Sequence, residues 1–188
     1  MHTLVLVLMS LVFVSTLIKL TFLKRWQLGL IVLLCAVFTG LSWRWAIEQS
    51  RSQIEAWLAN QSLMLDTSVV LTFEVICQTA YSVLAVRLMD RSERVGRSTL
   101  FCYRLLRIFP GILILPVIFA TEVSAIYALP GFSFAAIAWT LAAVILVILS
   151  LGSITVRYVI PEKELRLEIF FLLNMLIMVL GIVCTVKG

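Results

Sequence analysis

Long runs of apolar residues, separated by short clusters of polar and charged ones, dominate the chain. Six of these runs have about the 20 helical residues that are needed to cross the hydrocarbon core of a bilayer. They cover approximately residues 3–22, 27–47, 67–88, 109–128, 132–156 and 167–186. Runs such as Phe134–Leu149 are apolar on every face, unlike the alternating strands of a membrane β-barrel. The pattern predicts an all-α, polytopic integral membrane bundle of six transmembrane helices, formed as a single domain over residues 1–188.

The segment 48–66, between the second and third runs, has a different pattern. Its apolar residues recur every three or four positions, opposite charged and amide residues such as Arg51 and Asn60. This spacing predicts an outer amphipathic helix. We expect it to lie in the outer headgroup layer, with Trp57 on its apolar face in contact with lipid. The alternative is a docking surface for a partner, or a lid over a cavity.

The segment 89–109 is the most basic part of the chain. Ser98 or Thr99 would begin a helix that runs into the fourth span. On this helix, Arg104 and Arg107 would reach lipid phosphates or a partner, unless they serve only to set the topology. Pro110 follows directly, and it predicts a kink in the fourth span because proline lacks a backbone donor.

Composition and charge agree with a membrane location. The chain is 62% hydrophobic and 13% charged, with a mean hydropathy of +1.11 and a net charge of +5. Twelve of the 15 basic residues follow the first, third and fifth runs, and the others are Arg44, Arg51 and Lys187. Basic loops stay in the cytoplasm, which predicts a protein of the bacterial inner (cytoplasmic) membrane with both termini non-cytoplasmic. The basic residues alternate with acids near membrane ends, so we expect no nucleic-acid binding.

Residues suited to metal or covalent chemistry are scarce. The chain has one histidine, His2, and four cysteines without a C-x-x-C pair. It also lacks a glycine-rich phosphate loop. We therefore expect no metal site, no cofactor and no nucleophilic catalytic set.

Two acids, Glu74 and Glu122, lie inside runs that are otherwise apolar. An ionisable group in hydrocarbon is costly, and it indicates a functional site when a partner can be named. Counting from the outer ends of the third and fourth spans puts both carboxyls about 9–10 Å deep. This predicts one intramembrane polar layer. The other members of the layer would be Gln78, Trp139 and Asn174, with Arg44 approaching from the outer side.

Three interpretations of this layer stay open at this stage. The acids could bind a proton or cation during transport, they could fix helix register through polar partners, or they could face another subunit. We expect chiefly a subunit of a larger membrane complex, in contact with the lipid bilayer and with other membrane subunits or a second copy. Anionic lipid at the cytoplasmic face is a further expected partner. The alternatives are a small proton- or cation-coupled transporter using Glu74 and Glu122, and a lipid-handling enzyme.

Overall fold

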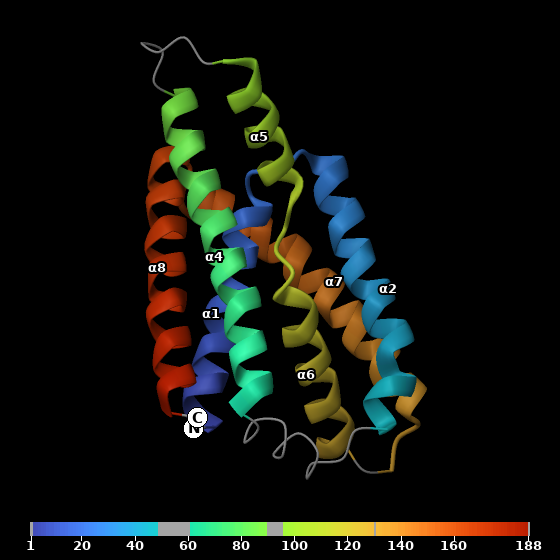
Figure 1. The fold of residues 1–188 in the computed structure, drawn as a ribbon. Helices are drawn as coiled ribbons and strands as arrows, with labels where there is room; N and C mark the ends of the chain where they lie inside the picture. The colour runs from blue at the N-terminus through green and yellow to red at the C-terminus, as the bar shows by residue number, and fades with distance from the viewer. Residues whose placement is uncertain (1, 49–60, 90–95, 130, 188) are drawn as a thin grey trace.

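The computed structural model describes residues 2–48, 61–89, 96–129 and 131–187, which form helices and no strand (Figure 1). Five of these helices are long and apolar enough to cross a membrane, which confirms the predicted class of helical, multi-pass bundle. In Figure 1, α1 begins and α8 ends at the same end of the bundle. The helices are α1 (His2–Leu20), α2 (Arg25–Glu48), α4 (Gln61–Met89), α5 (Arg97–Ile108), α6 (Ile114–Ala128), α7 (Phe134–Val159) and α8 (Lys163–Lys187).

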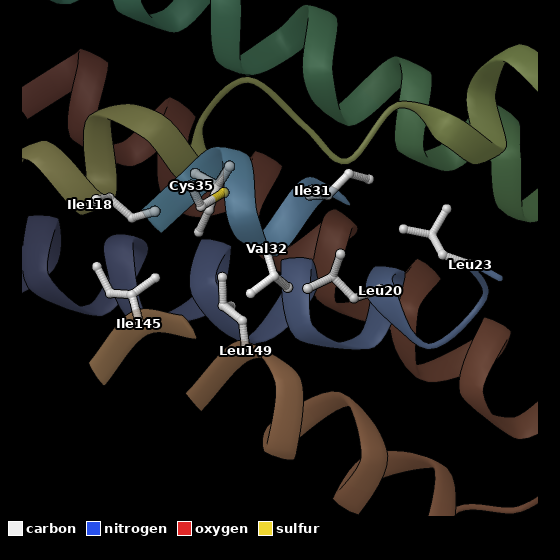
Figure 2. Close-up of a cluster of buried hydrophobic side chains, with 9 residues drawn as sticks. Leu20, Leu23, Ile31, Val32, Cys35, Ile118, Ile145 and Leu149 are labelled. Atoms are coloured by element: carbon white, nitrogen blue, oxygen red, sulfur yellow. The ribbon is translucent and has the colours of Figure 1, made fainter. Parts of the chain in front are cut away.

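The helices pack in two groups that α1 joins. On one side α8 lies against α4 and α1, and α5 packs on α4; on the other side α2 packs against α7 and α6 (Figure 1). The first helix also contacts α6 and α7, so it connects the groups. Figure 2 shows the apolar cluster at this junction, where Leu20 of α1, Val32 of α2 and Leu149 of α7 meet. Because lipid is as apolar as these side chains, close packing rather than exclusion of water holds such a junction.

The fourth predicted span, 109–128, is wrong as a continuous crossing. The helix α5 ends at Ile108, and α6 begins only at Ile114. Phe109 adopts an extended conformation because it precedes Pro110, and Gly111 then takes a φ of +114°. The expected kink is therefore a complete break. The 15 residues of α6 cover about 22 Å, which is less than the roughly 30 Å of a hydrocarbon core.

The third span begins at residue 67 as predicted, since the part of α4 that is apolar enough to cross a membrane is Thr67–Met89. The helix α4 itself starts earlier, at Gln61. Residues 61–66 of the segment 48–66 are therefore continuous with α4. The remainder of that segment, including Trp57, lies outside the described residues.

Close packing between α2 and α7 gives a first test of the fold. The ring of Trp139 on α7 covers Gly40 on α2, where an added β-carbon would lie 3.0 Å from the ring. We expect Gly40→Leu to destabilise the protein by about 1–3 kcal/mol, as overpacking does. Gly29→Leu on the same helix is the matched control, because no atom lies within 4 Å of its β-carbon position. Unfolding in mixed micelles, followed by circular dichroism, measures both; equal losses would contradict this packing.

Candidate functional site

A basic cavity of about 610 Å³ opens at the end of the bundle opposite the beginning of α1. Six cationic side chains line it, and among its described lining residues there is no acid. They come from the turn after α1, from the first residue of α2, from α5, from the end of α7 and from the beginning of α8. The six are Lys24, Arg25, Arg107, Arg157, Lys163 and Arg166.

Two of these arginines are fixed by backbone carbonyls at the end of α1. Arg107 donates from Nε and Nη2 to the carbonyl oxygen of Phe22, at 2.9 and 2.7 Å. Arg157 donates from Nη2 to the carbonyl oxygen of Leu23, at 2.8 Å. The last carbonyls of a helix and of the turn after it lack helical partners and carry partial negative charge. These contacts therefore give the carbonyl oxygens of the turn a hydrogen-bond partner and hold two guanidinium groups at the cavity.

Arg166 contributes donors that have no acceptor in the described part of the chain. Its side chain is only 5% exposed, and its guanidinium lies 5.5 Å from the Phe22 ring. Its Nε and Nη1 have no hydrogen-bond partner among the described residues, and neither does Nε of Arg157. Buried donors without an acceptor are costly, most of all on a charged group. Arg166 is thus a buried cation at the cavity whose charge is only partly compensated within the described part of the chain.

An aromatic cluster forms the inner wall of the cavity. The rings of Tyr81 and Tyr103 stack at 5.6 Å with an interplanar angle of 11°, and Phe22 and Phe170 pack on Tyr81 at their edges. Beneath this wall, Nζ of Lys19 lies 3.2 Å from the centre of the Tyr81 ring. A cation over an aromatic face is stabilised by the ring's electron density.

Lys19 was expected in the loop after the first span, yet it is a buried residue of α1. Its ammonium has no hydrogen-bond partner among the described residues. It interacts electrostatically with Glu74 of α4, the acid in the same group of helices. The amine of Lys19 therefore lies beneath the cavity wall, with Glu74 as an acid that acts on it. Sequence reasoning missed it because a lysine at the end of an apolar run reads as an interfacial anchor.

The carboxylate of Glu74 accepts hydrogen bonds from the backbone at the break between α5 and α6. Its Oε2 accepts hydrogen bonds from the backbone N–H groups of Ile112 and Leu113, at 2.6 and 2.7 Å. Gln78, one turn along the same face, donates to the carbonyl oxygen of Pro110 at 3.5 Å. A carboxylate at a helix N-terminus satisfies free donors and complements the helix dipole. The two side chains thus satisfy backbone groups that the break exposes.

Glu122 lies apart from Glu74. It is fully buried on α6, about 14 Å along the helix axis from Leu113 at roughly 1.5 Å per residue. Its Oε2 accepts a hydrogen bond from the Ser42 hydroxyl of α2. The two acids, which residue counting placed in one layer, therefore have separate partners: Glu74 at the α5–α6 break and Glu122 on α2.

The other residues of the predicted layer have separate partners. Asn174 donates to the carbonyl oxygen of Phe170 at 2.7 Å and to Ser15 of α1 at 3.4 Å, which ties α8 to α1. Trp139 packs on Gly40. Arg44 is exposed, with its guanidinium 5.6 Å from the Trp43 ring. Arg104 is exposed on α5 and is not among the residues that line the cavity, whereas Arg107 is.

Comparisons with protein-family models, with curated proteins and with solved structures found no match to this chain. Its function has to be inferred from the chemistry of the site itself.

The contact between Glu74 and the break predicts a stability difference between two variants. Glu74→Ala leaves one buried and one part-buried backbone donor without an acceptor, and we expect a loss of about 3 kcal/mol. Glu74→Gln keeps one acceptor oxygen, so its loss should be about half as large. Glu168→Ala, at an exposed acid of α8, should change stability by less than about 0.5 kcal/mol. Detergent unfolding curves measure all three; a Glu74→Ala protein as stable as the Glu168→Ala control would contradict the contact.

Gly111 provides an independent test of the same contact. Gly111 and Gly131 both have a positive φ, of +114° and +107°, so alanine at either should cost about 1–3 kcal/mol in backbone strain. Only at Gly111 would the β-carbon also meet Oε1 of Glu74, at 2.5 Å. Gly111→Ala should therefore lower the melting temperature more than Gly131→Ala. The additional loss should shrink when Gly111→Ala is combined with Glu74→Ala, and strict additivity would count against the crowding.

Proposed function

We propose that this chain is a membrane protein that binds a phosphate-bearing, anionic ligand in its basic cavity. The observation that carries the proposal is the set of six cationic side chains around one cavity whose described lining contains no acid. Guanidinium groups suit phosphate oxygens, because they present several N–H donors in a fixed planar geometry. A cavity lined by one sign of charge also concentrates ligands of the opposite sign.

The burial of Arg166 supports the proposal further. Like charges that are gathered at the end of a bundle repel one another, and burial adds to the cost of this one. Two of the arginines are partly compensated by the carbonyls of Phe22 and Leu23. Arg166 has no comparable contact among the described residues for two of its nitrogens. An anion in the cavity would offset the repulsion between these cations.

The contacts of Glu74 favour a structural role for this acid over an exchange of ions, since both backbone donors use its carboxylate. A proton- or cation-coupled transporter is the second candidate function, and Glu122 carries it. This acid is fully buried, and its Oε1 has no partner among the described residues. That candidate requires a pH-dependent flux in vesicles that Glu122→Gln abolishes. Membership in a larger complex, the first expectation from the sequence, would need a partner that copurifies in mild detergent.

Removal of charge from the cavity tests the proposed function. We expect dodecyl phosphate or inorganic phosphate to raise the melting temperature of the wild-type protein in a non-ionic detergent, because a ligand of the folded state stabilises it. At 100 times the dissociation constant, the gain is about 2.7 kcal/mol. The double variant Lys163→Gln/Arg166→Gln should lose most of this gain.

The matched control is Arg97→Gln/Arg104→Gln, which removes the same charge from exposed positions of α5 outside the cavity lining. It should keep the gain. If neither phosphate compound stabilises the wild-type protein, or if both double variants respond alike, the basic cavity is not an anion site.

A further inference from the structure

We infer that the anion is the phosphate of an anionic membrane lipid, which the bilayer itself presents at the mouth of the basic cavity. This inference rests on the proposed function and adds the source of the phosphate. A lipid headgroup and a free phosphate ion share the chemistry that the arginines recognise. The surroundings of the cavity decide between them.

Exposed amphipathic aromatics place the cavity at headgroup depth. Trp26 is 67% exposed and directly follows Arg25, and Tyr158 is 87% exposed and directly follows Arg157. Both arginines line the cavity. Trp and Tyr with this exposure are typical of the membrane–water interface, where their rings lie at the level of the headgroups. Lipid phosphates therefore lie at the same depth as the guanidinium groups.

The helix α5 brings hydrocarbon next to the cavity. Its outward stripe carries Phe101 and Leu105, which are 69% and 62% exposed, while Tyr103 and Arg107 of the same helix line the cavity. Large apolar side chains this exposed are stable against acyl chains and unfavourable in water. A lipid whose tail lies along this stripe would have its phosphate beside Arg107. Basic pockets between membrane helices suit anionic headgroups in this way.

Native mass spectrometry of the detergent-purified, full-length protein tests the inference. The probes are phosphatidylglycerol, which is anionic, phosphatidylcholine, which has a phosphate but no net charge, and inorganic phosphate. We expect phosphatidylglycerol to bind the wild-type protein more tightly than phosphatidylcholine. Each removed cation is worth about fivefold in affinity, so Lys163→Gln/Arg166→Gln should weaken binding about 25-fold or more.

Arg166 is buried, so a second cavity variant guards against a folding defect. Lys24→Gln/Arg25→Gln removes two exposed cations that also line the cavity, one in the turn after α1 and one at the first position of α2. It should weaken binding to a similar degree. The control Arg97→Gln/Arg104→Gln should weaken it less than fivefold. Equal weakening by control and cavity variants, or equal binding of the two lipids, would overturn the inference.

The outcomes also separate this inference from the proposed function. If inorganic phosphate stabilises the wild-type protein and phosphatidylglycerol does not bind, the lipid source is wrong and the anion site stands. If no phosphate compound binds, both are wrong.

Discussion

A break in a helix exposes backbone donors and acceptors that hydrocarbon cannot satisfy, and Glu74 and Gln78 meet this requirement between α5 and α6. The rest of the arrangement depends on it. Because the chain turns at Gly111, α5 packs on α4 instead of extending α6 in one continuous helix. In this position Tyr103 stacks on Tyr81, and Arg107 reaches the carbonyl oxygen of Phe22. An intramembrane acid thus supports a basic cavity at the end of the bundle.

Most charged side chains discussed for the described bundle have a compensating group within the chain. Backbone donors compensate Glu74, and carbonyls of the turn between α1 and α2 compensate Arg107 and Arg157. Lys19 relies on aromatic rings and on its interaction with Glu74. Arg166, like Lys19, keeps donors that lack an acceptor in the described chain. Arg166 lines the cavity proposed for an anion, and Lys19 lies beneath its aromatic wall.

The sequence predicts the membrane-spanning helices, because they depend only on the length and polarity of continuous stretches of the chain. Five of the six apolar runs correspond to long helices, because crossing a bilayer requires about 20 apolar residues. The break after Ile108 could be predicted only as a kink, since its stability comes from Glu74, a residue distant in sequence. Similarly, Lys24, Arg107 and Lys163 follow three different runs. Their charges indicated a shared side of the membrane, but their convergence on one cavity depends on helix packing that residue counting does not describe.

Lys19 contacts the wall of the basic cavity and also interacts with Glu74, the residue that holds the α5–α6 break. Its stem belongs to α1, its ammonium covers Tyr81 of the cavity wall, and its charge acts on Glu74. An anion at the proposed site and the carboxylate of Glu74 would both stabilise the ammonium of Lys19, since each supplies negative charge in a medium of low dielectric constant. Occupation of the proposed site would therefore be linked by electrostatics to the carboxylate that holds the α5–α6 break. The same physical requirement, a partner for every buried charge, thus governs both the fold and the proposed site.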